Sequence, residues 1–396
     1  MAATEAVIVD VVRTPSGRGK PDGELSDIHP ADLLAGVLLE IVGRTGIDPA
    51  VIDDVIGGCV TQSGEQAGNI IRTAVLSAGF PESIPGVTID RQCGSSQQAA
   101  AFAAQGVMAG AYDVVIACGV ESMSRAPMGS NVQGAALGGE LLKGRYPDGL
   151  VNQGVAAELI ADRWSFDRAQ LDDYAASSHG RAAWAAADGA FDGELVAVPT
   201  PDSGSVVADE TIRPGTTPEK LAQLQPVFRT DRLVARFPQL EWRITAGNSS
   251  PLTDGASAAL IMSAEAAKRL GLRPRARFHS FAVAGSDPLL MLTGILPATR
   301  KLLERSGVRM DEIDAYEVNE AFAPVPLLWQ QEFDADPSRL NPRGGAIALG
   351  HALGSSGTRL LATLLNEVEA RGGRYGLQTM CEGGGTANAT LIEVLR

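Results

Sequence analysis

The chain has 396 residues, of which 45% are hydrophobic and 20% charged, and its formal net charge is −14. A chain of this length exceeds one ordinary compact core, so two or three domains are expected. The negative charge argues against nucleic acid or an anionic membrane as the main partner, although a local basic patch could still hold a phosphate-bearing ligand.

The cysteines and the N-terminal residues bear on the compartment. Cys59, Cys93, Cys118 and Cys381 form no CxxC pair, which disfavours a structural zinc site, and no metal is predicted. The opening "MAATEAVIVDVVRTP" has no positively charged lead-in, so it predicts a first strand and not a signal peptide. No apolar run reaches the roughly 18 residues of a membrane span. We therefore expect a cytoplasmic protein with free thiols.

Strand-like and amphipathic helical runs alternate over residues 1–121. This alternation predicts an α/β fold with a mainly parallel sheet covered by helices on its faces. The predicted strands are 5–13, 52–60, 87–93 and 112–124, and the predicted helices are 29–46, ending at Gly43 or Gly46, 67–80 and 94–110.

The amino-acid composition changes between residues 122 and 243, where glycine, proline and charged residues become more frequent around a long helical stretch at 161–191. This region is interpreted as an inserted lobe. Strand–helix alternation resumes at 256 and continues to the C-terminus. The predicted domains are 1–121, the inserted 122–243, a return of the first half at 244–272, and 273–396.

Three pairs of similar segments occur in the same order in the two outer parts. "RTGIDPAVIDD" at Arg44 resembles "RSGVRMDEIDA" at Arg305, "CGSS" at 93 resembles "LGSS" at 353, and "VVIACG" near 118 resembles "LQTMCEG" near 381. Three ordered matches at a nearly constant offset predict a duplicated half. Related turns of the two halves can then converge on one central cleft.

Cys93 lies where a strand-like run gives way to a helical run. Backbone N–H groups at a helix N-terminus carry partial positive charge, which favours a thiolate and raises its nucleophilicity. An isolated cysteine is more often a buried, inert residue. A nucleophilic cysteine also needs a base, and among the four histidines only His351 is flanked by glycines that bring the backbone close to a site. His29, His179 and His279 fit surface or core positions.

Two further groups of residues stand at predicted strand ends. Asn319 and Glu320 close an apolar strand before a helix, where they serve either catalysis or helix capping. Cys381 precedes three glycines, whose backbone N–H groups can point at an oxyanion, and its thiol can move protons to and from carbon. A tight turn with a buried cysteine is the alternative interpretation.

Six motifs, in order and covering almost the whole chain, resemble the thiolase family. They are "QCGSS" at 92–96, "GVESMSRAPM" at 119–128, "TAGNSSPLTDGASA" at 245–258, "VNEAFA" at 318–323, "GGAIALGHALGSSG" at 344–357 and "MCEGGG" at 380–385. The resemblance implies two βαβαβαββ halves in a five-layered α/β/α/β/α core, with an inserted loop domain that holds coenzyme A.

The same resemblance implies a mechanism. Cys93 attacks a 3-oxoacyl-CoA and forms an acyl-enzyme. His351 takes the thiol proton and, with a water held by Asn319, stabilises one thioester oxyanion. Cys381 is the acid/base for the acetyl-CoA carbanion, and the N–H groups of Cys93 and Gly383 stabilise the other oxyanion. Coenzyme A and acyl-CoA are substrates, with no permanently bound cofactor.

Coenzyme A contacts implied by the resemblance are Ser250, Ala246, Met291, Ala321 and Phe322, with Gln225 in place of a basic residue near the adenine. The arginines at 229, 232 and 236 form either a solvated basic face or a phosphate site. The chain departs from the family pattern at Ala352 in place of proline, at Ala387 in place of glycine, and at Asn152-Gln153 in place of His-Met.

The resulting hypothesis is that the protein is a degradative thiolase of fatty-acid or steroid β-oxidation that releases acetyl-CoA or propionyl-CoA. Its preference for acyl chains of different length tests this hypothesis. The alternative is a biosynthetic acetoacetyl-CoA thiolase, which the Asn152-Gln153 pair disfavours. Two further alternatives are disfavoured. A ketoacyl synthase usually needs two active-site histidines, whereas only His351 lies in a suitable motif. A non-catalytic acyl-CoA carrier would have lost at least one of four residues that are all present here, Cys93, Asn319, His351 and Cys381. The family implies a homodimer or homotetramer.

Overall fold

The computed structural model describes residues 4–395. The N-terminal half contains strands β1 (Ala6–Arg13), β3 (Asp54–Gly58), β4 (Val87–Ile89), β5 (Val114–Ser122) and β8 (Thr253–Ser263), and helices α1 (Pro30–Thr45), α2 (Ile70–Ser77) and α3 (Ser95–Met108). The C-terminal half contains β9 (Ala276–Gly285), β10 (Ala315–Val318), β11 (Tyr375–Glu382) and β12 (Thr386–Val394), and helices α10 (Ile295–Ser306), α11 (Pro324–Phe333), α12 (Ala346–Leu349) and α13 (Ser356–Ala370).

The predicted duplication is confirmed by the element order. The strands β3 and β10, the strands β5 and β11, and the helices α3 and α13 each start 261 residues apart, at 54 and 315, 114 and 375, and 95 and 356. The strand order in the sheet is β10-β11-β12-β9-β1-β8-β5-β3-β4. Counted outward from the central pair of β9 and β1, equivalent strands of the two halves follow in the same order. The half-sheets join where β1 and β9 pair over two residues, Val7 with Arg277 and Ile8 with Ala276. At the position equivalent to β4, the second half has an isolated β-bridge between Tyr316 and Leu340 in place of a strand.

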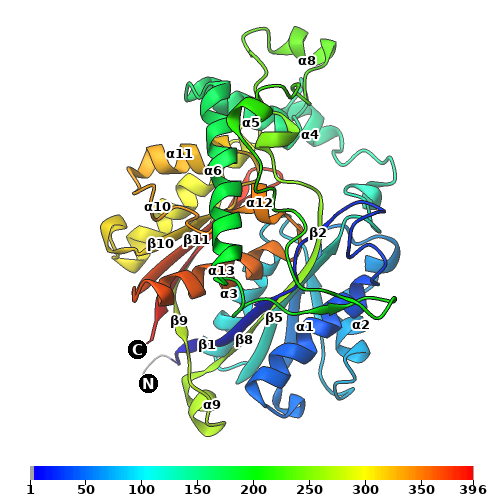
Figure 1. Ribbon diagram of the computed structural model, residues 1–396, viewed down its shortest axis with the longest axis vertical. Coiled ribbons are helices and arrows are strands. Elements are labelled where there is room, and N and C mark those ends of the chain that lie inside the picture. Colours follow the sequence, from blue (N-terminus) through cyan, green and yellow to red (C-terminus); the bar gives the residue numbers. More distant parts are fainter. Residues whose placement is uncertain (1–3, 396) are drawn as a thin grey trace.

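The layers follow from which faces bury apolar side chains. Helices α1 and α2 pack on the outer face of the N-terminal half-sheet, and α10 and α11 on the outer face of the C-terminal one. Between the two half-sheets lie α3 and α13, which pack against each other (Figure 1). This is the expected five-layered α/β/α/β/α core, and it brings the N-termini of the two central helices together.

Local chemistry explains several boundaries. Helix α1 begins after His29, whose Nδ1 accepts a hydrogen bond from the Ala31 N–H, and ends at Gly46, the second of the two glycines considered, with φ of 68°. Glycine adopts this left-handed conformation without steric cost. The strand predicted at 87–93 ends instead at Ile89, because a tight turn follows in which Gln92 has φ of 48°.

The inserted segment between β5 and β8 carries α4 (Glu140–Arg145), α5 (Gln153–Arg163), α6 (Arg168–Ala187), α7 (Pro218–Leu221) and α8 (Asp231–Arg236). The long helical stretch predicted at 161–191 is two helices, because the chain turns at Ser165 with φ of 61° and Asp167 caps α6 together with Gln170. The boundaries of the four predicted domains stay predictions.

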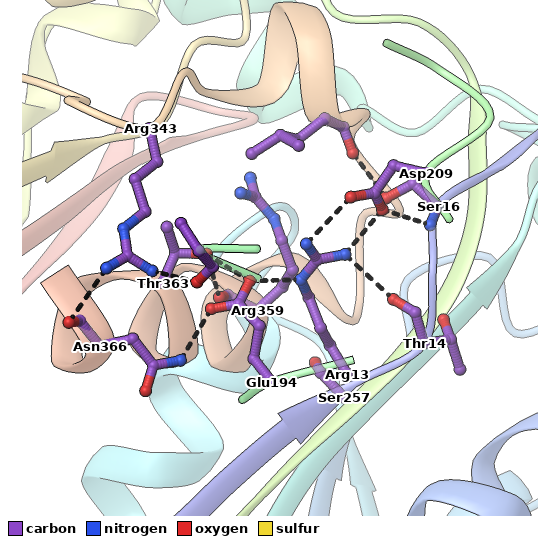
Figure 2. Close-up of polar contacts among 12 residues, drawn as sticks. Arg13, Thr14, Ser16, Glu194, Asp209, Ser257, Arg343, Arg359, Thr363 and Asn366 are labelled. Atoms are coloured by element: carbon purple, nitrogen blue, oxygen red, sulfur yellow. Dashed lines mark hydrogen bonds and ion pairs between the residues drawn. The ribbon is translucent and has the colours of Figure 1, made fainter. Parts of the chain in front are cut away.

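Buried charges fasten this segment to the core (Figure 2). Arg13 of β1 is fully buried, and its guanidinium donates to Glu194 and to Asp209 of the insertion, both over 2.6 Å. Glu194 also accepts hydrogen bonds from Thr363 and Asn366 of α13, over 3.0 and 2.9 Å. Because a buried charge without its partner is strongly destabilising, these contacts fix the insertion relative to the central helices.

Within residues 4–395, no helix combines the length and the apolar character needed to cross a membrane.

Candidate active site

Cys93 is held in a short turn between β4 and α3. The Ser95 hydroxyl donates to the carbonyl of Gln92 over 2.6 Å and accepts from the N–H of Arg91 over 2.9 Å. The Gln92 N–H donates to Asp90 over 2.6 Å, which supports its left-handed backbone. Residues in such conformations persist where the surrounding structure fixes them, often at functional sites. The turn therefore places the Cys93 sulfur at a defined point, two residues before α3 begins.

The position of Cys93 before α3 favours a thiolate, but burial of the sulfur acts against it. Burial raises the pKa of this thiol to about 12, and the charges of Glu382 and Glu121 act in the same direction. Only 3% of the residue is exposed, so the loss of hydration of the sulfur anion outweighs the helix N-terminus. A hydrogen bond with the side chain of Gln153 opposes the increase. Cys93 is therefore a neutral thiol that needs a base.

His351 has the properties of that base. Its Nδ1 lies 2.6 Å from the Ser356 hydroxyl, and that hydroxyl donates to the carbonyl of Ala352 over 2.8 Å. Since the hydroxyl proton is committed to Ala352, Nδ1 must carry the ring proton and Nε2 a free lone pair. Burial, reinforced by the charge of Arg359, lowers the pKa of His351 to about 3, so the ring is neutral.

Asn319 faces the basic nitrogen of His351. Its Nδ2 lies 3.4 Å from His351 Nε2, and its backbone N–H donates to the carbonyl of Thr379 on β11 over 3.1 Å. Its Oδ1 is buried and has no hydrogen-bond partner among residues 4–395. Helix α11 starts after Ala323, so neither Asn319 nor Glu320 caps it. A buried unpartnered acceptor favours a site for water or substrate over a purely structural role.

Cys381 lies near the end of β11 and is 1% exposed. Burial raises the pKa of its thiol well above the ordinary value, and the charges of Cys93 and Glu382 add to that increase. The two sulfurs are thus close enough for their charges to interact. A neutral thiol in this place can give a proton to a carbanion.

Three loops of the chain meet around the Cys93 sulfur. A small apolar cluster joins Cys93 with Met380, which precedes Cys381, and with Leu353, which follows His351 by two residues. Close backbone packing makes this possible, since a Cβ on Gly354 would lie 2.7 Å from Gly58. The structure therefore packs Cys93 against the segments that carry His351 and Cys381, and His351 in turn contacts Asn319.

Gly383 begins the turn between β11 and β12. A Cβ at this position would lie 2.9 Å from Oε1 of Gln92 and 3.3 Å from Nε2 of Gln153. The space above its backbone is thus bounded by two amide side chains. Gln153, the first residue of α5, reaches both Cys93 and Gly383 from the inserted segment.

Glu320 braces the loop that carries His351. Its carboxylate accepts hydrogen bonds from the hydroxyls of Tyr174 and Ser178 over 2.8 and 2.7 Å. It also accepts from Asn341 over 3.0 Å and from the N–H of Ile347 over 3.1 Å. The inserted helix α6, the strand end at Asn319 and helix α12 are therefore tied to one carboxylate.

Most of the residues expected to contact coenzyme A gather beside these loops. Met291 and Ala321 share an apolar cluster against which Phe322 and Phe228 pack, the two rings being 6.0 Å apart and edge-to-face. Ser250 approaches the same place, since its N–H and its hydroxyl each lie 3.1 Å from the carbonyl of Ala321.

The remaining expected contacts are mostly exposed. Ala246 begins a short 3-10 turn and lines a small cavity together with His179 and Ser249. Gln225 is exposed on the insertion. Arg229 and Arg232 are also exposed near α8, whereas Arg236 donates to the carbonyl of Gly149 over 2.7 Å.

The sequence interpretation missed the parts played by Gln153, Ser356, Glu320 and Glu382, because ordinary polar side chains acquire these contacts only through the fold. The other histidines lie away from Cys93: His29 caps α1, His179 accepts from the N–H of Arg213 over 3.2 Å, and His279 lies in β9. All four cysteines are unpaired. Among residues 4–395 no group of three or more His, Cys, Asp and Glu could hold a metal ion.

Comparisons with known proteins give consistent results over the full chain. Residues 6–265 match the family model "Thiolase, N-terminal domain" and residues 272–394 match "Thiolase, C-terminal domain". The steroid 3-ketoacyl-CoA thiolase FadA6 of Mycobacterium tuberculosis is 48% identical over 400 residues, covering 99% of this chain and 95% of that protein. The 3-ketoacyl-CoA thiolase of Idiomarina loihiensis is 41% identical over 405 residues, covering 98% and 99%. The crystal structure of Bacillus anthracis acetyl-CoA acetyltransferase superposes with a TM-score of 0.88 at 36% identity, covering all of both chains.

Proposed function

The chain belongs to the thiolase family of acyltransferases, and from that membership we propose that it cleaves 3-oxoacyl-CoA with free coenzyme A, releasing acetyl-CoA or propionyl-CoA and a shortened acyl-CoA. The observation that carries the proposal is the packing of Cys93 against the segments that carry Cys381 and His351, with both thiols and the imidazole buried and neutral. Each group is in the protonation state that its proposed role requires.

In the first half-reaction, Nε2 of His351 takes the proton of Cys93, and the resulting thiolate attacks the 3-oxo carbon. The bond between carbons 2 and 3 then breaks. The acyl group stays on the Cys93 sulfur, and the electron pair passes to the acetyl-CoA fragment as an enolate. Cys381 gives its proton to carbon 2, which completes acetyl-CoA.

In the second half-reaction, the Cys381 thiolate takes the proton of free coenzyme A. The coenzyme A thiolate attacks the acyl-enzyme carbonyl, and Cys93 leaves and recovers its proton from His351. Protons and charges balance over the cycle, so no metal or redox cofactor is required.

Two oxyanions need donors during these steps. We assign one to the N–H groups of Cys93 and Gly383, and the other to His351 together with a water held by Asn319, whose Oδ1 lacks a partner within residues 4–395. Oxyanion donors of this kind are typically worth about 3–4 kcal/mol each. Met291, Ala321, Phe322 and Ser250 are proposed to line the pantetheine channel.

The physiological substrate is proposed to be a degradative intermediate, either a fatty acyl or a steroid-derived 3-oxoacyl-CoA. The identity to relatives named 3-ketoacyl-CoA thiolase, one of them a steroid enzyme, supports this class. The Asn152-Gln153 pair in place of His-Met also supports it, because short-chain acetoacetyl-CoA members of the family often carry His-Met there.

The test is a thiolysis panel of 3-oxoacyl-CoA substrates, from four-carbon to branched and polycyclic, with products identified by mass spectrometry. The proposal expects an acyl group on Cys93 during turnover and higher kcat/KM for the larger substrates. Absence of thiolysis with every substrate would overturn it.

The second candidate is a biosynthetic acetoacetyl-CoA thiolase, which runs the same steps toward condensation. The superposition on an acetyl-CoA acetyltransferase favours it. A clear preference for acetoacetyl-CoA over eight-carbon or larger substrates would select this candidate.

We also propose that the protein acts in the cytoplasm as a homodimer or homotetramer. The unpaired cysteines support a reducing compartment. The outermost strand β4 supports assembly, because its outer edge pairs with no other strand among residues 4–395.

A further inference from the structure

Two glutamates occupy equivalent places in the duplicated halves. Glu121 stands near the end of β5 and Glu382 at the end of β11, 261 residues later, which is the offset that relates β5 to β11 as a whole. Each carboxyl group reaches across to the start of the other half's central helix. Glu121 meets Gly354, before α13, and Glu382 meets Gly94, before α3.

The carboxylate of Glu121 is fully occupied. It accepts hydrogen bonds from the backbone N–H groups of Val60, Thr61 and Gly354, each over 2.9 Å, and from the Gln66 amide over 3.1 Å. Four donors are a complete set for a buried carboxylate. On this side of the pseudo-symmetry the group serves to join the two halves.

The carboxyl group of Glu382 is equally buried but incompletely bonded. Its Oε2 accepts from the Thr386 hydroxyl over 2.7 Å, whereas its Oε1 has no partner among residues 4–395. Oε1 lies so close to Gly94 that a Cβ there would be 2.1 Å away. Asn388 reaches the same point and donates to the Gly94 carbonyl over 3.1 Å. A buried carboxyl oxygen without a donor thus lies against the residue that follows Cys93.

The charged and titratable groups around Glu382 come from both packed elements. Arg91 and Asp90 lie before α3; Arg91 lowers the pKa of Glu382 and Asp90 raises it. The charge of Glu382 in turn raises the pKa of the Cys93 and Cys381 thiols. Burial raises the pKa of Glu382 to about 7, with the Thr386 hydrogen bond acting against that increase. The carboxyl group therefore changes charge near neutral pH.

We propose that Glu382 is a positioning residue that sets the acidity of Cys93: its carboxylate opposes the thiolate and its protonated form does not, so the Cys93 thiolate forms less readily once the Glu382 carboxyl group has lost its proton. The inference deepens the proposed function and rests on Cys93 being the nucleophile. It differs from the role of Glu121, because the carboxylate of Glu121 has a full set of donors and the carboxyl group beside Cys93 does not.

The test follows the alkylation of Cys93 by iodoacetamide across pH, measured by mass spectrometry of the peptide that contains it. Wild type is compared with Glu382→Gln, which removes the charge and keeps the shape, and with Glu304→Gln, which removes an exposed charge elsewhere. Near pH 6 we expect Glu382→Gln and wild type to react alike, because the carboxyl group is then mostly protonated. At about pH 8 we expect the variant to react about fivefold faster, since one pKa unit is a factor of ten in thiolate.

Thr386→Val provides the second variant. It leaves the carboxyl group in place but removes its one hydrogen bond, so the charged form is disfavoured and alkylation should exceed wild type only around neutrality. Superimposable profiles for wild type, Glu382→Gln and Thr386→Val would overturn the proposal, and so would a rate difference that does not vary with pH. Alkylation reports on thiol acidity without turnover, so failure of the proposed thiolysis is detected separately.

Discussion

Nε2 of His351 lies 3.4 Å from Nδ2 of Asn319, although one residue follows a glycine turn and the other ends a β-strand. The contact exists because the Asn319 backbone is pinned to Thr379 of β11 and the His351 backbone donates to Thr253 of β8 over 2.9 Å. Strands from both halves therefore fix the distance between the base and the amide. An active site built this way depends on the geometry of both half-sheets.

The Ser356 hydroxyl determines which nitrogen of His351 is basic. Ser356→Ala removes the acceptor for the Nδ1 proton, so both tautomers become accessible and the base is oriented less well. We expect kcat/KM for thiolysis to fall about tenfold, the effect of one lost hydrogen bond of roughly 1.4 kcal/mol. Ser356→Thr keeps a hydroxyl and should recover most of the rate. Equal loss in both variants would show that packing, and not the hydrogen bond, is responsible.

The two catalytic thiols should separate in their effects. Cys93→Ala is expected to abolish acyl-enzyme formation, with thiolysis reduced at least about a thousandfold, because the sulfur that carries the acyl group is removed. Cys381→Ala should still acylate Cys93 but fail to exchange the α-proton of acetyl-CoA, measured as deuterium uptake by mass spectrometry. Full thiolysis in Cys93→Ala, or normal exchange in Cys381→Ala, contradicts the assigned roles. Circular dichroism verifies that both variants are folded.

Gln153 is the donor that favours the Cys93 thiolate. Gln153→Leu keeps a similar volume and removes the amide, so the pKa of Cys93 should increase further. We expect alkylation of Cys93 at about pH 8 to slow by roughly threefold to tenfold, as a lost hydrogen bond to a charged group implies. Gln153→Asn retains an amide on a shorter side chain and should give an intermediate rate. A faster reaction in Gln153→Leu would mean that the amide shields the sulfur and does not activate it.

The sequence predicted the central scaffold well because its signals are local and repeated. The structure contains the predicted strand–helix alternation, the glycine that ends α1 and the near-constant offset between the two halves. The effect of burial on the Cys93 thiol could not be predicted, since a helix N-terminus is visible in the sequence whereas burial of a sulfur among distant residues is not. For the same reason the contacts of Gln153 and Glu382 could not be predicted: each acquires its partner from a segment far away in the chain.

Glu320 offers a test of the brace around the His351 loop. Glu320→Gln turns one acceptor oxygen into a donor that faces other donors, at Tyr174, Ser178, Asn341 and Ile347. We expect the free energy of unfolding to fall by about 1.5–3 kcal/mol, as for loss of hydrogen bonds to a buried charged group. Because the loop is displaced, kcat should fall more than KM changes. Glu332→Gln, in α11 but outside this network, should leave kcat unchanged.

Acid should destabilise the fold partly through His179, a buried residue of α6 outside the catalytic site. Burial, with the charge of Arg213 acting in the same direction, lowers the pKa of His179 to about 4 from an ordinary value of 6.5. Between these values the unfolded chain binds a proton that the folded chain does not, so stability decreases as pH falls through this window. His179→Gln removes the titration and should flatten the decrease by up to about 1.4 kcal/mol per pH unit. Urea midpoints measured across the window test this, and His351, which titrates lower, contributes equally to both proteins. Parallel curves for wild type and variant would mean that His179 is protonated as readily in the folded chain as in the unfolded one, and that its contact with the Arg213 backbone does not depend on a neutral ring.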